Sequence, residues 1–170
     1  DNNKPQIIQG ILGDCYFISF IATFINHRYF VKEKFKTKDI SSNGCYEIIF
    51  FIDGEWQIVI IDDYVPCYRN RGRDKLLFAK TKANAIWGIL LEKAWAKING
   101  GYSNIIGGYS RDVAIALTSY PTEDIMHDNE YKNEDKLYDK IENALTNNNL
   151  VISYSKNEKE IKNNGLIPNH

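Results

Sequence analysis

The sequence predicts an α+β fold, in which helices and antiparallel strands occupy separate stretches of one chain. Three observations support this: an apolar run at 15–25, two β-branched and aromatic runs around Asp53-Gly54, and a periodic apolar pattern at 84–99. A chain of 170 residues is long enough to bury a hydrophobic core. We therefore expect a globular protein.

The first helix is expected to follow Asp14, whose side chain can cap its start. Residues 15–25, CYFISFIATFI, are apolar on every face except at Ser19 and Thr23. A helix that is apolar all round belongs in a core. The pattern thus predicts a buried helix with Cys15 in its first turn.

Residues 45–66, CYEIIFFIDGEWQIVIIDDYVP, carry the strongest hairpin signal in the chain, because Asp53-Gly54 separates two strand-like runs. Asp62 and Asp63 close the second run. We interpret them as solvated charges at a strand end rather than as metal ligands. The segment predicts an antiparallel hairpin.

A second helix is predicted at 84–99, ending at Gly100-Gly101. Its apolar face is expected to pack on the cysteine helix and consists of Trp87, Leu91, Ala94 and Ile98.

Beyond Pro121 the composition shifts toward Asn, Lys, Asp and Glu. The stretch 134–145 has helical spacing, and LVISY at 150–154 is typical of a strand. We therefore expect two lobes, 1–119 and 120–170.

Composition argues against several classes of partner and site. The formal net charge of −1 gives no field that would attract nucleic acid or anionic membranes, and no apolar run is long enough to span a membrane. Three cysteines without CxxC spacing argue against a disulfide framework or a structural zinc site, so Cys45 and Cys67 are expected to be packing or surface thiols. A reducing, cytoplasmic compartment fits best. Because residue 1 is not Met, we expect a piece of a longer polypeptide.

Cys15 has the surroundings of a nucleophile. The N-terminus of a helix favours negative charge, and the side-chain amide of Gln9 and the backbone N–H of Cys15 can both donate to an oxyanion. Gly10 and Gly13 allow the tight loop that would bring these donors together. For a cysteine in isolation, a small buried hydrophobe is the more common role.

The imidazole partner is less defined by the sequence. His27 lies about 18 Å from Cys15 along the same predicted helix and is out of reach. His127 lies in a polar joint with nothing to orient it. His170, in GLIPNH, follows the predicted strand of the second lobe and is the position from which an imidazole could face the cysteine helix.

Several segments resemble the calpain family of cysteine proteases. QGILGDCYFISFIA resembles its nucleophile signature QGxLGDCW, DGEWQIVIIDDYVP its GEWVxVVVDDxLP hairpin, and IWGILLEKAWAKINGGY its FWxALLEKAYAKINGxY helix. GLIPNH resembles the segment that carries the family histidine.

The resemblance implies a papain-like cysteine protease core, with a helical first lobe and a truncated, β-rich second lobe. It implies an intracellular endopeptidase that cleaves protein substrates through a thioester acyl-enzyme. Cys15 would be the nucleophile, Gln9 the oxyanion donor and His170 the general acid and base, while Gly107 and Gly108 would lie along the substrate backbone. The orienting Asn of the Cys-His-Asn set is expected beyond residue 170, together with further domains of the parent chain.

The family also implies a calcium site in the first lobe, built on an Asp and a Glu. This chain has Gln6 and Ala85 at those positions, so we expect that site to be lost and no metal to be bound there, although calcium could act on the full-length protein. Two alternative functions stay open: a catalytically silent calpain-like scaffold, and a papain-like acyltransferase that uses an amine in place of water.

Overall fold

A computed structural model of the chain describes residues 6–25, 32–82, 85–125 and 134–155. Its contacts divide the chain into two compact units, Asp1–Pro121 and Thr122–His170. Helices and strands both occur in the described residues, as the sequence predicts. The identification of the units with two protease lobes, 1–119 and 120–170, stays a prediction.

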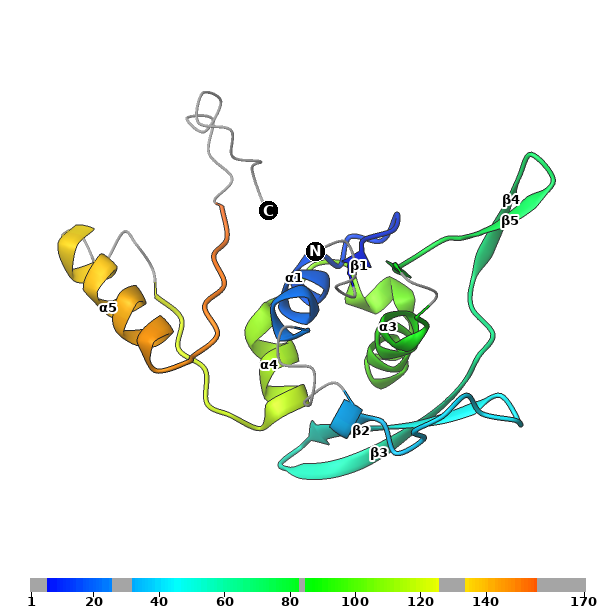
Figure 1. The fold of residues 1–170 in the computed structure, drawn as a ribbon, viewed down its shortest axis with the longest axis horizontal. Helices are drawn as coiled ribbons and strands as arrows, with labels where there is room; N and C mark the ends of the chain where they lie inside the picture. Colours follow the sequence, from blue (N-terminus) through cyan, green and yellow to red (C-terminus); the bar gives the residue numbers. More distant parts are fainter. Residues whose placement is uncertain (1–5, 26–31, 83–84, 126–133, 156–170) are drawn as a thin grey trace. The chain divides into compact units, whose positions relative to one another are not determined.

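The described part of the first unit contains three two-stranded antiparallel sheets, three longer α-helices and a short helical stretch at 32–34 (Figure 1). The strands are β1 (Ile7–Ile8), β2 (Cys45–Ile52), β3 (Glu55–Asp62), β4 (Cys67–Asn70), β5 (Arg73–Leu76) and β6 (Lys80–Thr81), paired as β1–β6, β2–β3 and β4–β5. The helices are α1 (Cys15–Phe24), α3 (Trp87–Ile98) and α4 (Ser110–Thr118), with a 3₁₀ turn, η1 (Tyr102–Ile105), before α4.

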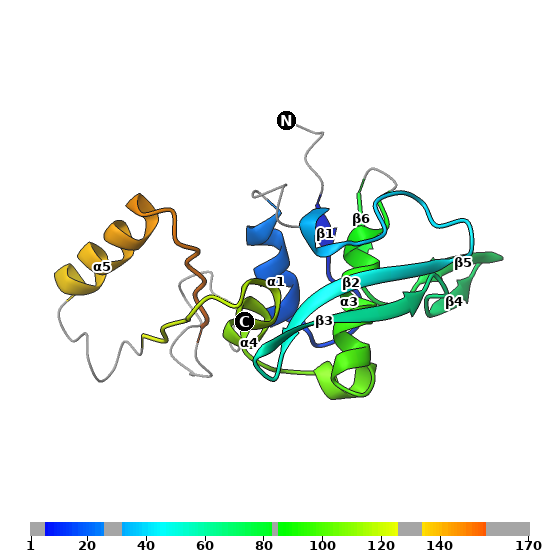
Figure 2. The ribbon, with the colours of Figure 1, turned by 90° about the horizontal axis from the view of Figure 1, so that it is seen from below.

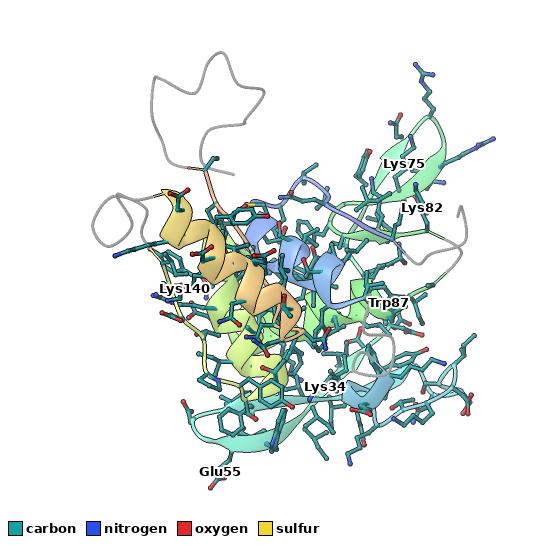
Figure 3. All side chains as sticks on the ribbon, turned by 60° about the vertical axis from the view of Figure 1, so that its left-hand side comes forward. Lys34, Glu55, Lys75, Lys82, Trp87 and Lys140 are labelled. Atoms are coloured by element: carbon teal, nitrogen blue, oxygen red, sulfur yellow. The ribbon has the colours of Figure 1, made fainter. Side chains whose placement is uncertain are left out.

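The predicted hairpin is present, with Ile52 paired to Glu55 across a two-residue turn. Asp53 and Gly54 have φ values of 52° and 84°, which are typical of the tight hairpin turn that Asp-Gly favours. The hairpin crosses α3 in Figure 2, and its inner side chains, which include the fully buried Ile48 and Phe50, join the core. Glu55 at the turn points away from the body of the unit (Figure 3).

Helix α1 is buried as predicted, with Phe17, Phe20 and Ile21 at most 1% exposed. It packs on α4. The prediction that the Asp14 side chain caps α1 is wrong, because that side chain makes no capping hydrogen bond. Its carboxyl group is instead directed into the core, where it is fully buried.

Helix α3 lies where the sequence predicts it and contacts β2, β3, β6 and η1. Its ring contact with α1 is made by Trp95, which stacks on Phe17 with the ring centroids 6.0 Å apart. Trp95 is outside the face predicted for this contact, and Trp87 and Ile98 of that face are only half-buried. The indole of Trp95 therefore makes the ring contact between the two helices from outside the predicted face.

In the second unit, α5 (Glu134–Thr146) confirms the predicted helix. Lys140 of α5 forms an ion pair with Glu123. The predicted strand at 150–154 is wrong, since these residues have no regular secondary structure and no strand occurs in the described part of this unit. An isolated strand has no partner for its backbone groups and gains nothing from its β propensity.

Two further expectations concern the surface. Cys45 and Cys67 are exposed and unpaired, and Cys45 lies opposite Asp62 rather than opposite Cys67. Within the described residues, no helix is long and apolar enough to cross a membrane.

Candidate active site

Cys15 is the first residue of α1, and its side chain is half-buried. The backbone carbonyl of Asp14 accepts hydrogen bonds from Phe17 N and Ile18 N, at 2.9 and 3.1 Å, which starts the helix just before the thiol. The first N–H groups of a helix have no carbonyl partner within it. The sulfur therefore lies at the positive end of a helix without being sealed in the core.

Gln9 belongs to the loop that leads from β1 to Cys15. Its side-chain Nε2 donates to the carbonyl oxygen of Leu12 at 2.7 Å, and the residue is half-buried. This bond closes the loop over three residues and fixes the orientation of the amide. The predicted convergence of that amide with the Cys15 N–H stays a prediction.

The structure brings Gly107 and Gly108 to the residues on either side of Cys15. Gly107 N donates to the Gly13 carbonyl at 2.8 Å, and a Cβ atom on Gly108 would lie 2.7–2.9 Å from ring atoms of Tyr16. Gly107 has a φ of +72° and open space where a Cβ would lie. Only residues without a side chain fit this approach, because one position is strained for L-residues and the other collides with a ring.

Tyr16 anchors the first turn of α1. Its hydroxyl accepts a hydrogen bond from Trp95 Nε1 at 3.0 Å, and its carbonyl accepts one from Ser110 Oγ at 2.6 Å. Burial raises the pKa of the Tyr16 phenol above its ordinary value, so the hydroxyl stays neutral. These bonds tie the residue after the thiol to both α3 and α4.

Asp14 and Glu92 form a buried carboxyl pair that sequence reasoning did not identify. Both are fully buried, and each is within hydrogen-bonding reach of the other. Desolvation, followed by the nearby Asp14 charge, raises the pKa of Glu92 to about 8, and desolvation also raises the pKa of Asp14. The available signal was a glutamate placed between Leu91 and Ala94 on the apolar side of a helix.

The two positions of the family calcium site adjoin β6. The Gln6 carbonyl accepts from Lys82 N at 2.9 Å, and the Ala85 carbonyl accepts from the Thr81 hydroxyl. Neither residue supplies a carboxylate, and the described residues hold no group of three or more His, Cys, Asp or Glu side chains arranged for a metal.

Asp62 ends β3 as predicted, and in addition its carboxylate forms an ion pair with Lys93 at 2.5 Å.

The described part of the first unit also contains a cavity of about 450 Å³ between β3 and α3. It is lined by Cys45, Ile60, Ile61, Asp62, Lys93, Ala96, Lys97, Gly101 and Tyr102, none of which is a predicted catalytic residue. The three histidines, His27, His127 and His170, lie outside the described residues.

Comparison with known proteins gives a consistent result. The family model described as calpain family cysteine protease matches residues 1–170. The calpain-type cysteine protease DEK1 of Zea mays is 36% identical over 124 residues, which cover 72% of this chain and 6% of that protein.

Two animal relatives match nearly the whole chain. Calpain-5 of Caenorhabditis elegans is 31% identical over 97% of this chain and 28% of its own length. Calpain-14 of Homo sapiens is 28% identical over 98% of this chain and 24% of its own length. The chain therefore spans less than a third of each of these relatives.

Proposed function

Because the chain belongs to the calpain family of cysteine proteases, we propose that it hydrolyses peptide bonds in protein substrates, with Cys15 as the nucleophile. In this proposal residues 1–119 and 120–170 are the first and second lobes of a papain-like core. The observation that carries the proposal is the position of Cys15. It is half-buried at the first residue of α1, directly after the Gln9–Asp14 loop, which Gly107 contacts through the Gly13 carbonyl.

The proposed reaction is acyl transfer. The Cys15 thiolate attacks the carbonyl carbon of the scissile peptide, and the oxygen that becomes negative accepts hydrogen bonds from the Gln9 amide and the Cys15 N–H. His170 then protonates the leaving amine as the C–N bond breaks, which leaves a thioester on Cys15. Water, deprotonated by the same imidazole, hydrolyses the thioester and restores the thiolate.

Gly107 and Gly108 are proposed to lie along the substrate backbone. Support comes from their exposure, from the contact of Gly107 N with the carbonyl of Gly13, and from the close approach of Gly108 to the ring of Tyr16, the residue after the thiol. A peptide backbone can approach closely where neither residue has a Cβ.

Calcium is proposed not to bind tightly at the position where the family site would lie. Gln6 and Ala85 provide a neutral amide and a methyl group, and calcium needs several hard oxygen ligands, commonly including carboxylates. We also propose that calcium acts on the full-length protein, that the parent chain has further domains, and that the protein is cytoplasmic.

Labelling with a peptidyl epoxide tests the proposed nucleophile. The full-length protein is incubated with the reagent, with and without calcium, and the modified cysteine is identified by mass spectrometry. We expect modification of Cys15, loss of peptide hydrolysis in Cys15→Ser, and normal hydrolysis in Cys45→Ser and Cys67→Ser, since both of those thiols are exposed.

If Cys15 stays unmodified and peptides stay intact with and without calcium, the protein is a catalytically silent scaffold and not a protease. If a primary amine reacts with the thioester faster than water does, the protein is an acyltransferase and not a protease.

A further inference from the structure

The loop before Cys15 rests on the segment Leu77–Ala79. Ile11 N donates to the Leu77 carbonyl at 3.2 Å. Gly10 lies so close to Phe78 that a Cβ atom at position 10 would overlap the backbone of Phe78. The position of the loop therefore depends on where this segment is held.

Glu92 of α3 holds that segment. Both of its carboxyl oxygens accept the backbone N–H of Ala79, at 3.0 and 3.1 Å, and the residue is fully buried. A carboxyl group in such a place satisfies a backbone donor that would otherwise be costly to bury. Glu92 thus fixes the support on which the loop rests.

Asp14, at the other end of the loop, contacts the same Glu92 carboxyl group. Neither carboxyl oxygen of Asp14 has a hydrogen-bond donor among the described residues, and the side chain is inaccessible to water. Two ionised carboxylates in contact would repel each other in a medium of low polarity. A proton on either group converts the contact into a hydrogen bond.

We propose that Asp14 and Glu92 share one proton, and that this hydrogen bond positions the Gln9–Asp14 loop beside the nucleophile. The inference rests on the proposed function, because the loop matters as the carrier of Gln9 and Cys15. The two carboxyl groups are positioning residues and do not touch the substrate.

The surroundings of the pair agree with one retained proton. Desolvation and the neighbouring Asp14 raise the pKa of Glu92 to about 8. The titratable groups that sense the pair are the phenols of Tyr16 on α1 and Tyr102 after α3, and burial raises the pKa of both. Both phenols stay neutral when the carboxyl pair loses its proton, so the loop is expected to loosen above about pH 8.

Hydrogen exchange of the full-length protein tests the proposal. Protection of the Gln9–Asp14 loop is measured from pH 6 to 9, after correction for intrinsic exchange, in the wild type and in Glu92→Gln, Glu92→Leu and Glu55→Gln. We expect wild-type protection to fall about ten-fold for each pH unit above 8. Glu92→Gln should keep its protection across the range, because an amide provides a permanent donor to Asp14.

The other variants separate positioning from folding. Glu92→Leu should lose loop protection at every pH, and Glu55→Gln, at an exposed hairpin turn, should behave as the wild type. The proposal is overturned if Glu92→Gln loses protection as the wild type does, or if wild-type protection does not change with pH. Should Glu92→Leu fail to fold, Glu92→Gln alone decides.

None of these measurements uses catalysis. A protein whose Cys15 is unreactive, but whose loop shows the expected exchange, would refute the proposed function and leave the shared proton standing.

Discussion

Two consecutive residues of α3, Glu92 and Lys93, each contact an aspartate, and the two aspartates lie in opposite environments. Glu92 points into the core and meets Asp14, and both carboxyl groups are fully buried. Lys93 is half-buried and pairs with the exposed Asp62, while also donating to the carbonyl of Tyr64. One helix therefore carries a buried acid pair and a solvated ion pair side by side.

The pKa values move in opposite directions at these two places. Desolvation raises the pKa of Glu92 to about 8, whereas the hydrogen bond from Lys93 lowers the pKa of Asp62. Burial without a cation favours the protonated acid, and a neighbouring ammonium favours the carboxylate. The comparison shows that stability at the buried pair depends on keeping a proton, and at the exposed pair on losing one.

Glu92→Leu should have the largest effect on stability, because it removes one member of the buried carboxyl pair. The substitution leaves the Ala79 N–H without an acceptor and Asp14 buried without a partner. We expect the free energy of unfolding, measured by urea denaturation at pH 7, to fall by about 3–5 kcal/mol. Glu55→Leu is the exposed control and should stay within about 0.5 kcal/mol. A loss below about 1 kcal/mol for Glu92→Leu would mean that the pair does not hold this part of the fold.

Asp14→Asn should change how stability depends on pH, because an amide donor replaces the proton that the two carboxyl groups share. In the wild type, the pKa of Glu92 is about 8 in the folded state against an ordinary value of 4.5, so the folded protein holds more protons between these limits. Its free energy of unfolding should therefore fall as pH rises, by roughly 2–3 kcal/mol between pH 6 and 8.

In Asp14→Asn this slope should be smaller, because the Asp14 charge is gone while the desolvation of Glu92 remains; urea denaturation at pH 6, 7 and 8 measures it. An unchanged slope would show that other groups take up the proton.

The elements that the sequence predicted have a strong local pattern. The apolar run of α1, the Asp53-Gly54 turn and the spacing of α5 each fix an element within a short stretch of chain. The β4–β5 hairpin was missed because its strands, CYRN and RDKL, are polar and largely exposed, so neither face shows an apolar alternation. Only the Arg71-Gly72 turn, with φ values of 47° and 76°, marks it.

The residues of the candidate site also fall into two groups: those that lie in a local sequence motif and those that are paired only by the fold. Cys15, Gln9 and the glycine pair could be proposed from the sequence because each lies in a segment that resembles a family motif, and their roles stay predictions. The pairing of Asp14 with Glu92 joins residues far apart in the chain. The position of Glu92 on the apolar side of a helix is a local signal of burial, but it does not identify the partner. Asp14 was expected to cap α1, since aspartate before a helix commonly does so. Here the buried partner takes its carboxyl group instead.

Asp62→Asn should give the smallest effect and tests the exposed member of the comparison. Because the pKa of Asp62 is lowered from its ordinary 3.8, its ion pair with Lys93 stabilises the fold above that value and this stabilisation is lost as pH falls through the folded pKa.

The melting temperature of Asp62→Asn should therefore lie slightly below that of the wild type at pH 6, and the difference should shrink as pH falls through the folded pKa of Asp62. The difference should also shrink in 1 M NaCl, because salt screens exposed charges. Asp39→Asn, at an exposed residue, is the control. Asp62 also accepts a hydrogen bond from Tyr64 N at 2.8 Å. A difference that changes neither with falling pH nor with salt would assign the effect to this hydrogen bond and not to the charge on Lys93.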